Sequence, residues 1–396
     1  MAILNQIKAL ADEYLAEITS IRRHIHQHPE LSFVEYKTSE FIQQQLQKIG
    51  ITNFKVMANT GVVALIECNE PESNTVALRA DIDALPIVEL NSVDYKSQQE
   101  GVMHACGHDV HTACLLGAAK ILFQLKHQLK GTIKLIFQPG EEKLPGGASL
   151  LIKEGVLKNP DVKTITGQHV MPLLPAGKVG FRSGLYMAST DELYVTVKGK
   201  GGHGAMPHLC IDPVLISAHI ITSLQQLVSR HANPIIPSVL TFGKVEAKGA
   251  TNVIPDVVKL EGTFRTLDEN WRAVAHEKMV NMAQHIAEGM GGSCEFEVRK
   301  GYPFLKNNEG LTAMAKLAAV EYLGEQNVVD LDIWMAAEDF AFYSQEVPAT
   351  FYRLGTRNES LGITSGVHTP TFNIDESALV IGMGLMAWIT AKQLMA

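Results

Sequence analysis

The sequence predicts an α/β protein whose main domain is interrupted by a smaller α+β insertion. In residues 1–185, short apolar runs alternate with segments of helical periodicity, which indicates a sheet covered by helices. Over residues 186–299 the expected order changes to βαββαβ, the ferredoxin-like arrangement. The alternating pattern returns from residue 300. We therefore expect one discontinuous domain, 1–185 with 300–396, and one insertion at 186–299.

The elements of the main domain follow from hydrophobic periodicity. An amphipathic helix is expected within residues 1–30, and a second helix in the segment HTACLLGAAKILFQLKHQ at 111–128. Apolar runs predict strands at 61–68, 74–80, 131–138 and 161–168. After the insertion we expect a helix at 309–322, a strand at 349–355 and a terminal helix at 376–394.

The insertion contains the second group of expected elements. Strands are expected at 191–200, 237–247, 257–267 and 294–300, and helices at 212–230 and 270–290. Asp212 is well placed to cap the first of these helices, with Pro213 in its first turn. Gly291 and Gly292 follow the second helix, where glycine commonly ends a helix. Both helix boundaries are therefore marked by residue type as well as by periodicity.

Composition excludes several classes of function. The 396 residues are 46% hydrophobic and carry a formal net charge of −8, so we expect no nucleic-acid partner, which would require a basic surface. Five scattered cysteines fit a reducing compartment better than a disulfide framework. Because neither a signal-peptide pattern nor a run of eighteen apolar residues is present, we expect no membrane span and a cytoplasmic location.

The segment MHACGHDVH, residues 103–111, concentrates metal-binding residue types. Cys106 and His108 lie two positions apart in a glycine-containing turn before a helix, so both can point at one centre. Short Cys/His motifs often occur without a metal, and a zinc finger would need a second ligand pair nearby, which is absent. On its own the segment leaves a metal site and a buried thiol beside solvated histidines equally open.

Paired carboxylates follow two of the predicted strands. Glu141 and Glu142 come after the strand at 131–138 and a Pro-Gly turn, and Asp81 and Asp83 follow the strand at 74–80. Adjacent carboxylates repel each other unless one binds a cation and the other acts as a base. A solvated acidic loop is the commoner reading of such a pair. Ligands of open α/β sheets bind at the carboxyl ends of strands, however, and this location favours function.

Two further histidines lie in corresponding positions. His169 is expected just past the strand at 161–168, and His368 in the loop after the strand at 349–355. A set rich in nitrogen, oxygen and sulfur ligands exceeds one tetrahedral site and suits two neighbouring metals, about 3.5–4 Å apart in hydrolytic centres. The residues placed at this rim of the sheet are Asp81, Asp83, Cys106, His108, Glu141, Glu142, His169 and His368.

Parts of the sequence are compatible with three other functions. The spacing of Gly199, Gly201 and Gly204 resembles a dinucleotide fingerprint, but Pro207 intervenes before the helix and no acidic residue follows at the ribose position. Cys106 could be a nucleophile with a neighbouring histidine as its base, which would leave Glu141 and the other acidic and histidine residues unexplained. A metal-binding or peptide-binding module without catalysis is the third alternative.

The motifs together resemble the M20 metallopeptidase family, most closely its amidohydrolase branch of hippurate hydrolases, N-acyl-L-amino acid amidohydrolases and auxin-conjugate hydrolases. They are RRHIHQHPELSF, LRADIDALP, MHACGHDVHTA, QPGEE, GQHVMP, GKGGHGAMPH, NVIPD and GTFRT, in order from about residue 20 to 375. The resemblance implies a zinc-peptidase-like catalytic domain, with a mixed sheet covered by helices, and a ferredoxin-like lid domain that commonly dimerises.

The resemblance also assigns roles in the catalytic domain. Glu141 would be the general base, and Asp83 would take the acidic position of the family's His-x-Asp motif. Asp81 stands where that motif has a metal-binding histidine, so both aspartates are expected beside the ligands rather than among them. The implied metal ligands are Cys106, His108, Glu142, His169 and His368, with the Cys106 thiolate bridging two ions.

In the lid, three residues match positions near the substrate of related enzymes. His203 corresponds to a histidine that reaches toward the neighbouring active site in related dimers, and we expect it to stabilise the oxyanion. Asn252 or Arg265 would hold the α-carboxylate of the substrate, for which a guanidinium is well suited. An ordinary strand-surface arginine remains the alternative for Arg265.

The expected activity is hydrolysis of N-acyl amino acids, with an acetyl, benzoyl or similar acyl group, to a carboxylate and a free amino acid. Two divalent metal ions (Zn, Mn, Ni or Co) would activate the attacking water, with Glu141 as its base. A dipeptidase or aminopeptidase of the same family is the alternative. The expected partners are this small-molecule substrate and a second copy of the chain, bound through the lid.

Overall fold

The computed structural model describes residues 2–395 and divides them into two compact units. The larger unit runs up to Tyr186 and also contains Lys306–Ile333 and the chain from Asp339 onward. The smaller unit contains Met187–Leu305 and Trp334–Glu338. The smaller unit thus extends beyond the expected insertion at 186–299 to Leu305, and it also includes Trp334–Glu338. This segment joins the smaller unit because Ala188 N donates to Trp334 O and Ala336 O, a long-range pairing without a local sequence signal.

An eight-stranded mixed sheet forms the centre of the larger unit, with strand order β1-β2-β4-β3-β5-β16-β6-β15. β3 pairs in parallel with β4 and β5, and β5 in parallel with β16, whereas β2 and β6 run antiparallel to their neighbours β4 and β16. The strands are β1 (Phe54–Met57), β2 (Gly61–Glu67), β3 (Thr75–Asp81), β4 (Thr132–Gln138), β5 (Thr164–Pro175), β6 (Val179–Phe181), β15 (Val328–Asp330) and β16 (Ala349–Arg357). The short strands β7 (Gly184–Met187) and β14 (Leu305–Asn307) form a separate pair.

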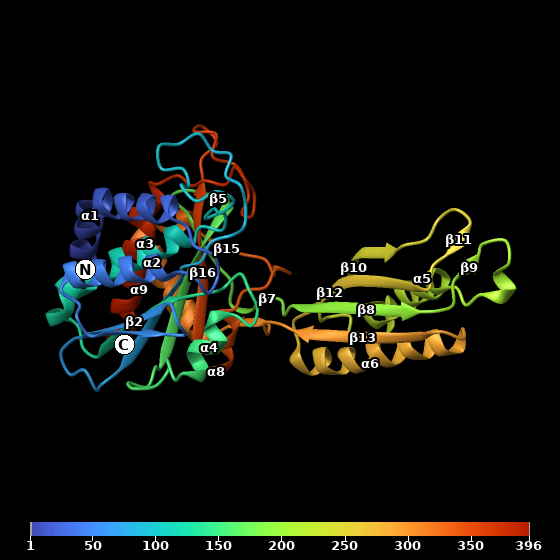
Figure 1. Ribbon diagram of the computed structural model, residues 1–396. Helices are drawn as coiled ribbons and strands as arrows, with labels where there is room; N and C mark the ends of the chain where they lie inside the picture. The colour runs from blue at the N-terminus through green and yellow to red at the C-terminus, as the bar shows by residue number, and fades with distance from the viewer. Residues whose placement is uncertain (1, 396) are drawn as a thin grey trace. The chain divides into compact units, whose positions relative to one another are not determined.

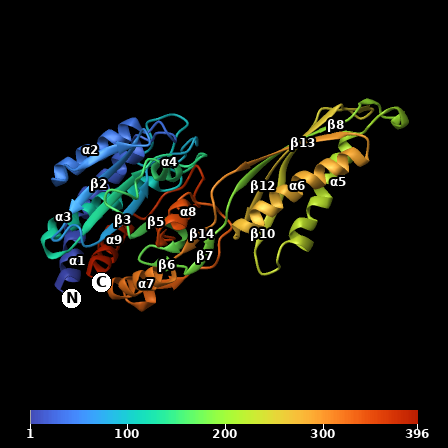
Figure 2. The same ribbon diagram turned by 90° about the horizontal axis from the view of Figure 1, so that it is seen from below.

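Helices cover both faces of this sheet, which confirms the predicted fold class. On one face α3 contacts α1, α2 and α9, and α7 packs on α9; on the other face α4 and α8 contact each other (Figures 1 and 2). The helices are α1 (Ala2–Gln27), α2 (Tyr36–Ile49), α3 (His108–Leu125), α4 (Gly147–Lys153), α7 (Glu309–Leu323), α8 (Ala341–Glu346) and α9 (Ala378–Met395), with short turns η1 (Lys126–Gln128) and η4 (Glu325–Asn327).

The helix α9 bears on the expectation of no membrane span. Within residues 2–395 it alone has the length and apolar composition of a segment that could cross a bilayer. Most of its residues are buried in the larger unit, where it contacts α1, α3 and α7. Its apolar character is therefore that of a core helix surrounded by other elements.

The smaller unit has the βαββαβ order of a ferredoxin-like fold. Its antiparallel sheet has the strand order β10-β12-β8-β13, and α5 and α6 lie side by side on one face (Figure 2). The elements are β8 (Asp191–Lys198), β9 (Gly202–His203), η2 (Pro207–Leu209), α5 (Pro213–Leu224), η3 (Leu227–His231), β10 (Ser238–Ala247), β11 (Val253–Ile254), β12 (Val257–Thr266), α6 (Glu269–Gly289) and β13 (Ser293–Lys300).

The helix boundaries of this unit follow from their capping residues. The Asp212 carboxylate accepts hydrogen bonds from the backbone N–H groups of Val214 and Leu215, as expected for an N-cap. The predicted helix at 212–230 ends early, because α5 stops at Leu224 and the chain continues as a π-helical turn, η3. Gly291 adopts φ +83° just after α6, the left-handed conformation in which glycine commonly ends a helix.

Candidate metal centre

The candidate site lies at the carboxyl ends of the parallel strands of the larger unit. In the sheet register, Asp81 at the end of β3 pairs with Gln138 at the end of β4, and Arg79 pairs with Gly167, which places Asp81 level with His169. His169 thus lies inside β5 rather than after it, because β5 continues along β16 as far as Pro175. The eight residues expected at this rim all belong to the larger unit.

The thiol of Cys106 contacts two histidine side chains. Its Sγ lies 3.4 Å from His169 Nε2 and 3.3 Å from His368 Nε2, and His368 Nε2 lies 3.1 Å from Glu142 Oε1. The next residue, Gly107, has φ +84°, and a Cβ there would lie 2.6 Å from Val170 Cγ2. A glycine at this position therefore allows the start of α3 to approach β5.

Asp83 orients both His108 and Glu142. Its Oδ1 lies 3.1 Å from His108 Nδ1, and its Oδ2 accepts hydrogen bonds from Glu142 N at 3.0 Å and from Ser32 Oγ at 2.7 Å. Burial lowers the pKa of His108, but the carboxylates of Asp81 and Asp83 outweigh this effect and raise it to about 10. The second nitrogen of His108 is turned toward Glu142, with Nε2 3.9 Å from Glu142 Oε1.

Two buried polar atoms at this point lack hydrogen-bond partners among residues 2–395. They are His108 Nε2 and Glu142 Oε1, and the second of them has only the ion-pair contact with His368 Nε2 at 3.1 Å. An unsatisfied buried polar atom costs about 1–3 kcal/mol, so these atoms need an explanation, and bound cations would satisfy them. Ligand atoms of Cys106, His108 and His169 lie within 4.8 Å of one another, as do those of Cys106, Glu142 and His368. The two groups share Cys106, and their mixed N, O and S donors suit a transition metal.

His111 and Asp81 are already engaged with other groups. His111 Nδ1 lies 2.6 Å from Asp81 Oδ1, and its Nε2 accepts a hydrogen bond from Val170 N at 2.9 Å. Although ligand atoms of Asp81, His108 and His111 also lie within 4.8 Å of one another, neither nitrogen of His111 is left for a metal. The other oxygen of Asp81 lies 2.6 Å from Arg79 Nη1.

The remaining residues of the segment 103–111 belong to the core beneath the site. Asp109 lies in the first turn of α3 and binds Arg22 at 2.7 Å and His26 at 2.8 Å. His104 is buried, and neither of its ring nitrogens has a hydrogen-bond partner in the described structure. Burial lowers the pKa of His104 to about 4, so the neutral imidazole is the favoured form at neutral pH.

The surroundings of Cys106 do not favour a nucleophilic thiolate. Burial raises the pKa of its thiol well above the usual value, and the neighbouring carboxylates of Glu142 and Glu141 raise it further. A reactive cysteine normally lies in an electropositive environment that lowers its pKa. The acidic surroundings of Cys106 instead suit a thiol that loses its proton when it binds a cation.

The comparison with protein families decides the identity of this fold and site. The family described as Peptidase family M20/M25/M40 matches residues 77–391. The chain belongs to the M20 peptidase family. It is therefore a hydrolase, and the family resemblance inferred from its motifs is confirmed.

Individual M20 relatives match over most of the chain. An N-acyl-L-amino acid amidohydrolase of Geobacillus stearothermophilus is 43% identical over 77% of this chain and 82% of its own length. An N-acetyl-L-cysteine deacetylase of Bacillus subtilis is 40% identical, covering 92% and 85%. The crystal structure of the Bacillus subtilis YXEP protein, described as a dinuclear metal binding peptidase of the M20 family, has a TM-score of 0.83 and 35% identity, covering 97% of this chain and 99% of that one.

The three candidate residues of the smaller unit are described within that unit. His203 is exposed in the short strand β9, where it pairs with Val253, and the carbonyl of Asn252 accepts a hydrogen bond from Gly204 N at 2.8 Å. Arg265 lies on β12 with a half-buried side chain, and its Nη1 donates to Met335 O at 3.4 Å. His203 and Asn252 are thus brought together on neighbouring segments, whereas Arg265 lies on a different strand.

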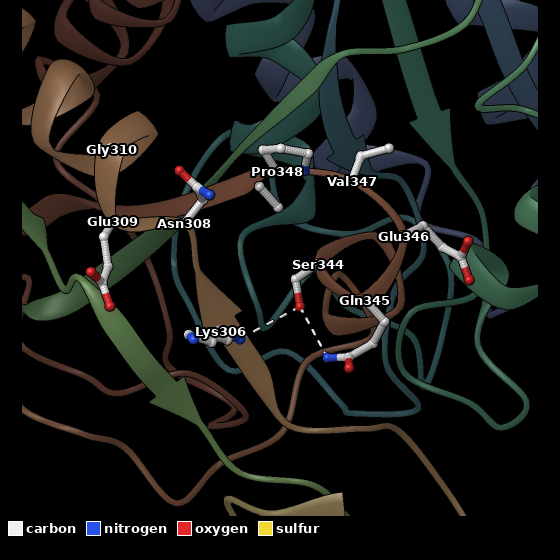
Figure 3. Close-up of a pocket in the computed structure, with 10 residues that line it drawn as sticks. Lys306, Asn308, Glu309, Gly310, Ser344, Gln345, Glu346, Val347 and Pro348 are labelled. Carbon is white, nitrogen blue, oxygen red and sulfur yellow. Dashed lines mark hydrogen bonds between the residues drawn. The ribbon is translucent and has the colours of Figure 1, made fainter.

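Figure 3 shows a pocket of about 480 Å³ at the amino end of β16, whereas the candidate site lies at the carboxyl ends of the parallel strands. The pocket surrounds the amino end of β16, where Ser344 Oγ accepts a hydrogen bond from Gln345 Nε2. None of the eight residues of the candidate site lines it. The residues that line it are Lys306, Asn308, Glu309, Gly310, Ser344, Gln345, Glu346, Val347, Pro348 and Ala349.

Two residues at the site were missed by the sequence analysis. Arg79 is fully buried and bridges Asp81 to Asp339 Oδ1 at 2.7 Å. Arg79 carried a usable signal, since it is a charged residue within the apolar strand TVALRAD, and a charge buried there must be paired. Asp339 lies far away in the sequence, in a segment with no predicted element.

Proposed function

We propose that this chain hydrolyses the amide bond of N-acyl amino acids at a centre that holds two divalent metal ions. The observation that carries the proposal is the convergence of two ligand groups on Cys106, beside the paired carboxylates of Glu141 and Glu142. The names of the relatives support the substrate class, because they include an N-acyl-L-amino acid amidohydrolase and an N-acetyl-L-cysteine deacetylase.

Five side chains would hold the metals. One ion would be bound by His108 and His169, the other by Glu142 and His368, and Cys106 would bridge them as a thiolate. When bound, Zn, Mn, Ni or Co ions lower the pKa of a ligand water and polarise the substrate carbonyl. Asp83 holds His108 from behind at 3.1 Å, and the Val170 carbonyl lies 2.8 Å from His169 Nδ1. These contacts direct the Nε2 atoms of both rings toward the centre.

Glu141 would move the proton in the reaction. Glu141 is only 7% exposed, which keeps it largely out of bulk water. It would accept a proton from the attacking water and then deliver that proton to the nitrogen of the leaving amino acid. An adjacent pair of carboxylates can divide the work in this way, with Glu142 as a ligand and Glu141 as the base.

Residues of the smaller unit would complete substrate recognition. By resemblance, His203 would donate to the developing oxyanion and Asn252 or Arg265 would hold the α-carboxylate of the substrate.

We also propose that the chain forms a homodimer through this unit and acts in the cytoplasm. A monomer in size-exclusion chromatography with light scattering would contradict the proposed dimer.

The metal mechanism is tested by depletion and reconstitution. The purified chain is treated with a chelator, and release of amino acid from N-acetyl and N-benzoyl amino acids is measured before and after adding back Zn, Mn, Ni or Co. We expect turnover to disappear with the metal and to return with at least one of the four ions. Undiminished turnover of the metal-free protein would contradict the proposal and favour a cysteine nucleophile.

The role of Glu141 is tested by one substitution with a matched control. Glu141→Gln keeps the shape of the side chain but removes its basicity, so we expect unchanged metal content and a loss of turnover by about 10²–10⁴-fold. Glu72→Gln makes the same change at an exposed position of the same unit and should leave turnover unaltered. Full activity of Glu141→Gln would show that another group is the base.

A further inference from the structure

Arg79 connects three groups around the candidate site. Its Nη1 donates to Asp81 Oδ2 at 2.6 Å, its Nη2 to Asp339 Oδ1 at 2.7 Å, and its Nε to Gln138 Oε1 at 2.9 Å. The side chains of Arg79, Asp81 and Asp339 are all fully buried. Because a buried guanidinium is stable only when paired, this arrangement fixes the carboxylate of Asp339 relative to β3 and β4.

Asp339 contacts the beginning and the end of the loop that carries the paired glutamates. At the beginning, Nε2 of Gln138, the last residue of β4, lies 2.8 Å from both carboxylate oxygens of Asp339. At the end, Ala148 N, in the first turn of α4, donates to Asp339 Oδ2 at 3.0 Å. Between these two residues lies the segment 139–147. Its middle is also held, because the backbone N–H of Asp339 donates to Glu141 Oε1 at 3.4 Å.

The same loop is closed at its base. Gly147 N donates to Gly140 O at 3.0 Å, and a Cβ on Gly147 would lie 1.7 Å from the carbonyl oxygen of Pro139. The two ends of the loop therefore pass so close together that only glycine fits. A loop closed in this way, with the Asp339 carboxylate bonded at both ends and the Asp339 backbone N–H bonded to Glu141, leaves Glu141 little freedom to move.

We propose that Asp339, itself held by Arg79, is the positioning residue for Glu141. The proposal rests on the role of Glu141 as general base. The carboxylate of Asp339 holds the ends of the 139–147 loop and fixes the backbone whose N–H bonds Glu141, so loss of that carboxylate displaces the base. Reacting groups must be aligned closely, and a misplacement of about 1 Å can cost about 10²-fold in rate.

The test combines kinetics with amide hydrogen exchange of the full chain. In Asp339→Asn we expect kcat to fall about 10–100-fold while KM stays within about 3-fold, with unchanged metal content. Exchange of the amides in 139–148 should become faster. Gln138→Met, which removes one of the donors to Asp339, is a milder second variant and should change both readouts in the same direction.

A double-variant cycle separates positioning from general damage. If Asp339 acts through Glu141, Asp339→Asn should cost nothing further in the Glu141→Gln background. An additive further loss, or unaltered exchange in 139–148, would overturn the proposal. Asp191→Asn is the matched control, because Asp191 is also buried and paired with an arginine, Arg272, but lies in the smaller unit. It should leave exchange in 139–148 unchanged.

Failure of the positioning role and failure of the proposed reaction give different results. Full turnover of Glu141→Gln would overturn the assignment of the base and, with it, the positioning role. Loss of turnover in Glu141→Gln, with full turnover in Asp339→Asn, would overturn only the role of Asp339. Hydrogen exchange is measured without substrate, so it reports the hold of Asp339 on the loop independently of activity.

Discussion

Asp83 Oδ1 lies 3.1 Å from Nδ1 of His108 inside the protein, and the same carboxylate accepts the backbone N–H of Glu142 at 3.0 Å. One aspartate thus orients two proposed metal ligands. Burial raises the pKa of Asp83, but hydrogen bonds from His108 and Ser32 outweigh this effect and hold it below its ordinary value. The carboxylate is therefore charged at neutral pH and holds a proton on Nδ1 of His108, so a cation that binds this ring displaces the proton on Nε2.

The first prediction concerns this orienting role. Asp83→Asn removes the charge that orients His108 and should weaken metal affinity by about 10–100-fold. The affinity is measured by competition with a chromophoric chelator. Asp161→Asn, a change at an exposed position of the larger unit, serves as the control. Equal affinities of the two variants would mean that Asp83 does not act on the ligands.

The second prediction concerns the shared position of Cys106. Cys106→Ser replaces a thiol with a hydroxyl that does not readily ionise, so we expect the bound metal to fall below two ions per chain and turnover to be lost. Cys114→Ser alters another buried free cysteine of the same helix region and should cost stability without changing the metal content. Elemental analysis distinguishes the two. Two ions retained in Cys106→Ser would argue against a bridging thiolate.

The third prediction tests the close approach at Gly107. Gly107→Ala places a methyl group 2.6 Å from Val170 Cγ2 and forces alanine into φ +84°, so it should lower the free energy of unfolding by about 2–4 kcal/mol. Gly101→Ala provides the control, because Gly101 has φ +75° but no atom within 4 Å of its added Cβ. It should cost only the backbone strain, about 1 kcal/mol. Denaturant unfolding measures both.

Much of the fold could be predicted because its main elements have strong local patterns. The buried strands β2, β3 and β4 are mostly apolar, and Asp212 marks the start of α5. The helix α2 was missed, because its sequence YKTSEFIQQQLQKI is mostly polar and its N-cap residue Glu35 makes no side-chain capping bond. The strand β6 has three residues, too few to show any periodicity.

The candidate site also contains residues that the sequence predicts and residues that it does not. The paired carboxylates and His169 stand directly after predicted strands, so the rule that ligands bind at the carboxyl ends of strands brings them together without a structure. The pairing of Arg79 with Asp339 spans 260 residues and depends on where a loop folds back. Local sequence holds no information on such a contact. Residues that orient the ligands are therefore harder to predict than the ligands themselves.

The last prediction concerns pH and the smaller unit. Asp191 is buried beside Arg272 at 2.6 Å and His276 at 2.7 Å. Burial raises its pKa, but the bonds from His276 and Arg272 outweigh this effect and lower it below the ordinary value of 3.8. Since the folded form then binds its proton less readily than the unfolded chain, Asp191 contributes stability above about pH 4. That contribution is lost as the pH falls through the folded pKa.

Asp191→Asn should therefore lower the free energy of unfolding at pH 7 by about 3–5 kcal/mol, because it leaves the buried Arg272 without its partner charge. The difference between the natural chain and the variant should narrow as the pH is lowered below 4, when protonation neutralises Asp191 in the natural chain as well. Urea unfolding at pH 7, 5 and 3 measures it. Asp256→Asn, at an exposed position of the same unit, should show a much smaller difference. A difference for Asp191→Asn that stayed constant from pH 7 to 3 would mean that its charge does not stabilise the fold.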